Sequence, residues 1–185
     1  MAVFLLFANG ALTIGIAIAA LPVFSQYRYR MALWLLALSV IWFSLQAVDN
    51  AHVLSMLSLS QEYAKAGAAN ADLFQGLGAV VGAARKWAHY TELLVIDGWM
   101  FVFYSLLWRS ALAPRALTAF GLITVTLHTT GITLPLFLGY RSVMLMGVPL
   151  AVSHVAVALW LIVRGFDERH RPLHAEAPAV EVVRA

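Results

Sequence analysis

Long apolar runs separated by short polar links make up most of this chain. A helix needs roughly 20 apolar residues to cross about 30 Å of hydrocarbon, and a lipid-exposed strand would leave its backbone hydrogen bonds unsatisfied. The pattern therefore predicts an all-α fold, a polytopic transmembrane helical bundle of about five spans. The predicted spans cover residues 2–24, 31–57, 87–108, 116–138 and 143–163.

Residues 60–86, between the second and third runs, are less hydrophobic. Their larger apolar side chains recur at intervals of three and four residues, which is typical of an amphipathic helix. The recurring positions are Leu73, Phe74, Leu77, Val80, Val81 and Ala84. We expect a helix at the outer membrane interface, capped by Asn70 or Asp72, which serves either as a lid over the outer ends of the second and third spans or as an anchor.

Composition agrees with a membrane location. The residues are 62% hydrophobic and 11% charged, and the mean hydropathy is +0.83, which is too apolar for a water-soluble domain. One helical domain, residues 1–165, accounts for almost all of the chain, and residues 166–185 are expected to form a flexible cytoplasmic tail. The absence of cysteine excludes disulfides and thiolate metal sites, so any metal needs His and carboxylate ligands.

The net charge of +3 reflects membrane topology and not nucleic-acid binding, because most arginines stand at span ends. The arginines that fall on one side are Arg28, Arg30, Arg109, Arg115, Arg164, Arg169 and Arg171. Positive residues mark the cytoplasmic side of a membrane protein. We therefore expect a multi-pass protein of the cell inner membrane, partnered by the lipid bilayer, with its N-terminus outside and its C-terminus in the cytoplasm.

Several motifs between residues 60 and 140 resemble a known family. Leu-Ser-Gln-Glu-Tyr-Ala is followed by Leu-Gly-Ala and then by Trp87-Ala88-His89. The most specific motif is Tyr104-x-Leu106-x-x-Arg109-Ser110-x-x-x-Pro114-Arg115. Together they resemble a bacterial multi-pass membrane family of unknown function, domain of unknown function 4386. The resemblance implies a helical membrane protein and carries no activity.

Seven ionisable side chains lie in or at the edge of the apolar runs, where such groups are costly and usually mark a site. Counted at about 1.5 Å per residue from the cytoplasmic arginines, they sort into two layers. The outer layer holds Asp49, His52, His89 and Glu92. The inner layer holds Asp97, His128 and His154.

Both layers contain metal-ligating chemistry. Asp49 and His52, like His89 and Glu92, stand three residues apart, which places each pair on one helix face. Paired acid and histidine faces can clasp a metal in a helical bundle. The inner layer offers two imidazoles and one carboxylate from three helices, a ligand set that suits zinc or non-haem iron with open positions.

The first hypothesis is a transition-metal site, for zinc or iron, that opens to the outer face. Asp97, His128 and His154 would be the metal ligands, and Glu92 or Asp49 the general acid or base. The bound metal would activate water or oxygen toward a lipophilic small molecule that arrives from the bilayer.

Two alternatives remain open. The histidines form two level pairs, His52 with His89 and His128 with His154, as bis-histidine ligation of haem b in an electron-transfer protein requires. The other alternative is a non-enzymatic subunit that binds a small molecule, relays protons or serves as an accessory. The sequence leaves open whether the protein is an enzyme and whether it binds any cofactor.

Two further features bear on ligands and assembly. Trp42 and Trp99 lie deep enough in their spans to be pocket walls. Gly10 and Gly15 on the first span allow close helix packing, which leaves homo-oligomerisation open.

Overall fold

The computed structural model describes residues 2–66, 70–139 and 144–167, and these ranges contain helices and no strand. Four helices are long and apolar enough to cross a membrane, which fits a membrane protein. The elements in chain order are α1 (Ala2–Ala66), α2 (Ala71–Arg109), α3 (Arg115–Leu138), the short 3-10 helix η2 (Met144–Gly147) and α4 (Val148–Arg164). The predicted all-α class is confirmed.

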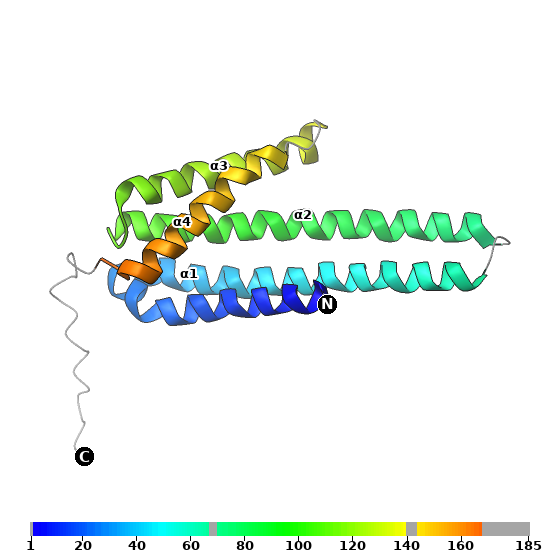
Figure 1. Ribbon diagram of the computed structural model, residues 1–185, viewed down its shortest axis with the longest axis horizontal. Helices are drawn as coiled ribbons and strands as arrows, with labels where there is room; N and C mark the ends of the chain where they lie inside the picture. Colours follow the sequence, from blue (N-terminus) through cyan, green and yellow to red (C-terminus); the bar gives the residue numbers. More distant parts are fainter. Residues whose placement is uncertain (1, 67–69, 140–143, 168–185) are drawn as a thin grey trace, which may run out of the picture.

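Helix α1 folds back on itself at Arg28, whose φ of −148° and ψ of 72° are not helical. The two halves then run side by side in opposite directions (Figure 1). The rings of Phe7 and Phe43 meet edge to face with centroids 5.9 Å apart, and Gly10 lies against Phe43 and Gln46. The predicted runs 2–24 and 31–57 are therefore the two arms of one bent element.

The expected separate amphipathic helix at residues 60–86 is not seen. Its first residues are the last turns of α1, and residues 71–86 are the first turns of α2, which continues without a break to Arg109. The two helices support each other there, since the rings of Tyr63 and Phe74 meet edge to face and Gly78 lies beside Leu59. This packing keeps the glycine-containing segment helical, and the two helices form a long hairpin (Figure 1).

Smaller differences concern helix ends. Asn70 does precede α2, but its side chain makes no capping hydrogen bond. The last helix, expected from residue 143, begins at Val148, where Pro149 in the first turn suits a helix start. Residues 140–143 lie outside the described residues, and so do residues 168–185 of the tail that is expected to be flexible from residue 166.

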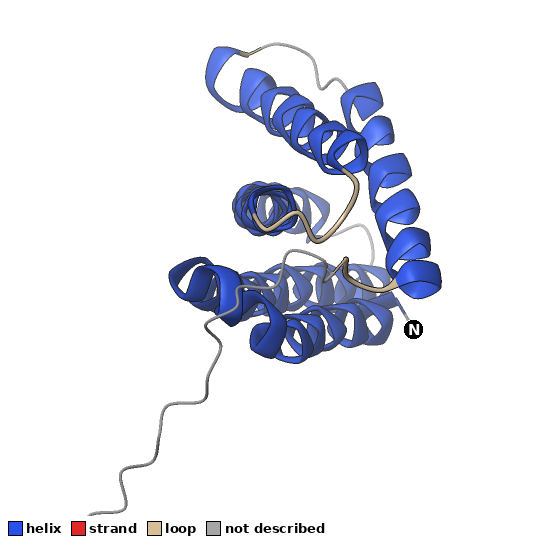
Figure 2. Cartoon of the chain, turned by 90° about the vertical axis from the view of Figure 1, so that its left-hand side faces the viewer, coloured by secondary structure: helices blue, strands red, loops and turns tan. Residues whose placement is uncertain are grey.

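Helix α2 lies between α1 and α3 in the stacked layers of the bundle (Figure 2). Its buried face carries Tyr104, Leu106 and Leu107, none of which is exposed. Leu112 and Ala113 in the turn to α3 are also buried, and the backbone N–H of Asp167 donates to the Leu112 carbonyl. The other buried apolar members of this core are Ala20, Phe24, Ala32, Leu35, Trp99, Phe103, Val125, Leu150 and Val157.

We expect Gly121→Ala to destabilise the bundle. An added Cβ at this buried position on α3 would overlap the ring of Tyr104, which hydrogen bonds to α4 and has no free space to move. Overpacking of this kind costs about 1–3 kcal/mol, more than the roughly 1 kcal/mol that alanine gains over glycine in a helix. The thermal unfolding midpoint in detergent measures the effect.

Gly15→Ala is the matched control, because no atom lies within 4 Å of its added Cβ. This variant should unfold at the wild-type temperature or above it. Equal stabilisation by both substitutions would contradict the close contact between α2 and α3.

Candidate functional site

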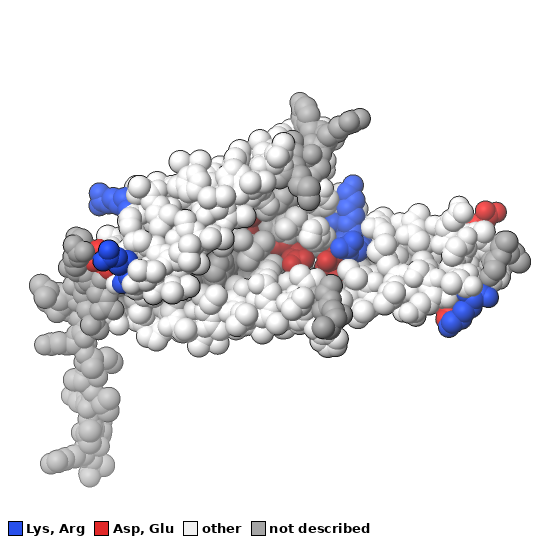
Figure 3. Space-filling view, viewed as in Figure 1, with Lys and Arg blue, Asp and Glu red and all other residues white. Residues whose placement is uncertain are grey.

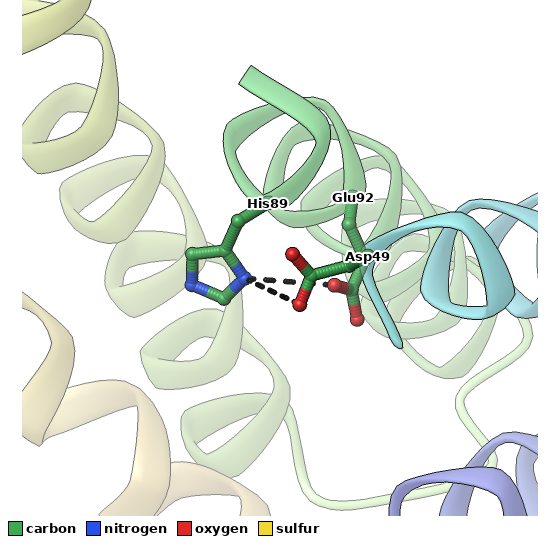
Figure 4. A group of neighbouring side chains, drawn as sticks. All are labelled: Asp49, His89 and Glu92. Carbon is green, nitrogen blue, oxygen red and sulfur yellow. Dashed lines mark ion pairs between the residues drawn. The ribbon is translucent and has the colours of Figure 1, made fainter. Parts of the chain in front are cut away.

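The outer group joins the two long helices. Asp49 comes from α1, while His89 and Glu92 come from adjacent turns of α2 (Figure 4). The imidazole points its Nδ1 toward both carboxylates, at 3.7 Å from Asp49 Oδ2 and 3.6 Å from Glu92 Oε2. One ligand atom from each of the three residues lies within 4.8 Å of the other two. This is the group among the described residues whose spacing allows it to hold a metal ion.

Burial differs sharply within this group. The side chains of Asp49 and Glu92 are 7% and 11% exposed, whereas that of His89 is 47% exposed. The two carboxylates are therefore the buried part of the group, and the imidazole is the part that solvent reaches. A ligand would reach the carboxylates past His89.

One further charge touches the group. Arg85 Nε lies 3.7 Å from Asp49 Oδ1, and the arginine is 44% exposed. Asp49 Oδ1 is buried and accepts no hydrogen bond in the described structure, so this ionic contact is its compensation. Figure 3 shows acidic side chains beside basic ones in the middle of the molecule, on a surface that is otherwise largely uncharged.

The inner acid has its partners within the bundle. Asp97 Oδ1 shares a 2.7 Å hydrogen bond with His128 Nδ1, and Thr129 Oγ1 donates to Asp97 Oδ2 at 2.9 Å. Both carboxylate oxygens are thus hydrogen bonded between α2 and α3. The ring of His128 also faces Gly147, whose added Cβ would be 3.2 Å from Cδ2.

His154 belongs to a different network. Its Nδ1 shares a 3.2 Å hydrogen bond with the Tyr104 hydroxyl, which also lies 3.2 Å from Ser153 Oγ. Ser153 in turn bonds to Thr124 Oγ1 at 3.0 Å, so this network joins α2, α3 and α4.

The structure regroups the residues that the sequence singles out. The predicted metal ligands Asp97 and His128 meet, but His154 is held by Tyr104. The predicted acid or base residues Asp49 and Glu92 instead face His89 as a potential ligand set.

His52 lies one turn from Asp49, is partly buried and is not part of that group. Its predicted haem-binding role, alone or with the other histidines, stays a prediction.

Sequence reasoning missed the hydroxyl groups of the inner network. In the sequence, Tyr104 stands out only as the first residue of the turn motif, and Thr129 is one of several threonines in the fourth predicted span. Thr129 does bond the Val125 carbonyl, but its hydroxyl also reaches Asp97. Thr129 directly follows His128 in the sequence. No periodicity within this helix predicts that both side chains reach an acid on another helix.

The whole helical part of the chain matches one family. Residues 1–165 match the domain of unknown function DUF4386. The chain belongs to this family. No curated protein and no solved structure matches this chain. Membership in the DUF4386 family confirms the resemblance seen in the turn motif. The family has no assigned activity.

We expect Asp97→Leu to destabilise the protein more than Asp97→Asn. Leucine leaves His128 and Thr129 without their acceptor, whereas asparagine keeps an oxygen in reach. A buried polar group left unpaired costs about 1–3 kcal/mol. Thermal unfolding of both variants in detergent measures the difference. Equal midpoints for wild type and Asp97→Leu would show that these bonds contribute no net stability.

Proposed function

We propose that this DUF4386 protein binds a divalent transition-metal ion, zinc or iron, at Asp49, His89 and Glu92. The observation that carries the proposal is the convergence of one imidazole and two carboxylates from α1 and α2. Imidazole and carboxylate are ligands that both ions accept. Three protein ligands leave a position open for water or a substrate, as in catalytic metal sites.

The spacing of the group supports this role. With metal bonds of about 2.0–2.2 Å, two ligand atoms of a tetrahedral site lie about 3.3–3.6 Å apart. His89 Nδ1 lies 3.6 Å and 3.7 Å from its two carboxylate neighbours, which is too long for a hydrogen bond and close to that spacing. Small side-chain movements would bring all three groups to one ion.

The net charge of the group also supports metal binding. Of the two largely buried carboxylates, Asp49 has Arg85 at 3.7 Å and Glu92 has only His89, at 3.6 Å, so a neutral His89 leaves one negative charge uncompensated. Buried charges are normally paired or coordinate metals. A divalent cation would supply the missing charge, and the half-exposed His89 gives it a path to the site. The competing arrangement is a network of ion pairs with a protonated His89.

The proposal includes a place in the membrane. If the two arms of α1 cross separately, the chain crosses five times, with its N-terminus outside and its C-terminus in the cytoplasm of a cell inner membrane. Arg85 and Arg109 are 24 residues apart on α2, or about 36 Å along a helix, which suits one crossing. Asp49, His89 and Glu92 would then lie near the outer face, and the rest of the hairpin would project beyond it.

A bound ion of this kind lowers the pKa of water or polarises a substrate oxygen. The chain's own contribution would be to hold the ion between two helices, with His89, Asp49 and Glu92 as its ligands. The predicted action on a lipophilic small molecule belongs to this proposal. Haem b ligated by histidine pairs remains the alternative, and it predicts a coloured protein with a Soret absorption band.

Metal titration tests the proposal. Protein purified in detergent is stripped with a chelator and titrated with Co²⁺, whose absorption reports coordination, and then with Zn²⁺ as competitor. We expect one equivalent to bind, and His89→Ala and Glu92→Gln each to weaken binding by about tenfold or more, since each removes a ligand. Binding should also weaken as pH falls, because protons compete for the same ligand atoms.

Two variants serve as controls for this titration. Glu62→Gln removes an exposed carboxylate near the hairpin tip and should bind metal like wild type. His128→Ala distinguishes the inner residues: loss of binding there, with binding kept in His89→Ala, would move the site to Asp97, His128 and His154. No binding to the stripped wild type, with its helical circular dichroism intact, would leave the ion-pair network as the correct account.

A further inference from the structure

Helix α4 stands apart from α1 and α2. Its Cα atoms all lie more than 8 Å from those of both helices, while its backbone packs against α3. Figure 1 shows α4 running obliquely across the side of α2, from the far end of α3 toward the bend of α1. Only side chains connect α4 to these two helices, and one of them is Tyr104, whose hydroxyl bonds to Ser153 and His154. A wedge is left between α4 and the first two helices.

This wedge contains a cavity of about 570 Å³. Ligand pockets in proteins typically enclose about 300–1,000 Å³ and are mostly apolar with a few polar groups. Here most of the wall is aliphatic or aromatic, and Trp42 and Trp99 are part of it, as predicted. Its polar residues are Asn9, Thr13, Tyr104 and His154.

The polar groups are placed to orient a ligand. When Nδ1 of His154 accepts from the Tyr104 hydroxyl, Nε2 carries the ring proton and can donate to a bound molecule. Among the described residues, the Tyr104 hydroxyl makes the hydrogen bonds between α2 and α4, one with this imidazole and one with Ser153. A ligand oxygen in the cavity would meet this imidazole while its apolar part packs against the aromatic wall.

The cavity opens toward the face that lipid would cover. Ile16 and Ile162 line it and are 51% and 80% exposed. Most of the outer surface along α4 is uncharged in Figure 3, and charged side chains gather at its C-terminal end, where Arg164 lies in the last turn. A water-soluble ligand gains nothing from such an opening, whereas a molecule dissolved in the bilayer can pass between α1 and α4.

We propose that this cavity binds a lipid-soluble molecule bearing a carbonyl oxygen, held by the Tyr104 and His154 pair and stacked against Trp42 and Trp99. The site is assembled from α1, α2 and α4. It does not require a metal at Asp49, His89 and Glu92, although the two sites share the same pair of helices. The cavity is a second ligand site, separate from the metal group, none of whose residues line it.

A photoreactive ketone tests this site. The probe is 4-dodecylbenzophenone, whose carbonyl both accepts a hydrogen bond and forms the cross-link, added to the full-length protein in nanodiscs of saturated phosphatidylcholine. We expect saturable labelling at the cavity, mapped by mass spectrometry to Met100 and to the α4 peptide. A long-chain methyl ketone should compete for this labelling, and an alkane of equal length should not.

Variants of the wall sharpen the test. Ala158→Phe fills the cavity from α4 and should lower the apparent affinity by about tenfold or more, which corresponds to about 1.4 kcal/mol. Ala151→Phe is the matched control, since Ala151 is exposed on the same helix and does not line the cavity. Tyr104→Phe should weaken ketone binding about fivefold, because the His154 ring loses the hydrogen bond that holds it.

The outcomes separate this site from the metal site. Glu92→Gln should keep full labelling, because that residue is outside the cavity wall. Equal competition by alkane and ketone would overturn the proposal and mean that lipid acyl chains merely fill the wedge. Labelling that is unchanged in Ala158→Phe, with wild-type helicity, would also overturn it.

Discussion

The antiparallel packing of α1 against α2 is the constraint on which the rest of this structure depends. It brings Asp49 into contact with His89, a residue 40 positions later. It also places a tryptophan at the same distance from an acidic residue on each helix. Trp42 stands seven residues before Asp49, and Trp99 stands seven residues after Glu92. Seven residues are about two helical turns, so one seam carries both the acidic group and an aromatic wall of the cavity.

Tyr104 attaches the remaining helices to this pair. Its ring lies against Gly121 of α3, and its hydroxyl reaches Ser153 and His154 of α4. Tyr104 is also the first residue of the turn motif that ends at Arg115, and Leu106 of this motif is fully buried. These motif residues therefore serve packing at the end of α2, where three helices meet around one phenol.

The two acidic groups differ in how completely the protein satisfies them. Asp97 has a hydrogen-bond partner on each carboxylate oxygen, so it gains little from another ligand. Asp49 has a buried oxygen with no hydrogen bond and faces a second carboxylate across a half-exposed imidazole. Under-satisfied buried charge is the usual mark of a binding site, which is why the outer group is the stronger candidate for an ion.

The sequence by itself determined the helical class, the membrane character, the family and the chemistry present at Asp49, Glu92, Asp97 and the histidines, because hydrophobic run length and ionisable residues are local properties. Depth counting along each span placed Asp97 level with His128, and the two do meet. Only the tertiary structure decided that His154 pairs with Tyr104, that residues 60–66 and 71–86 extend two long helices, and that α4 leaves a cavity. Those outcomes depend on the rotation of each helix about its axis and on how α4 crosses α2, which periodicity within one segment does not specify.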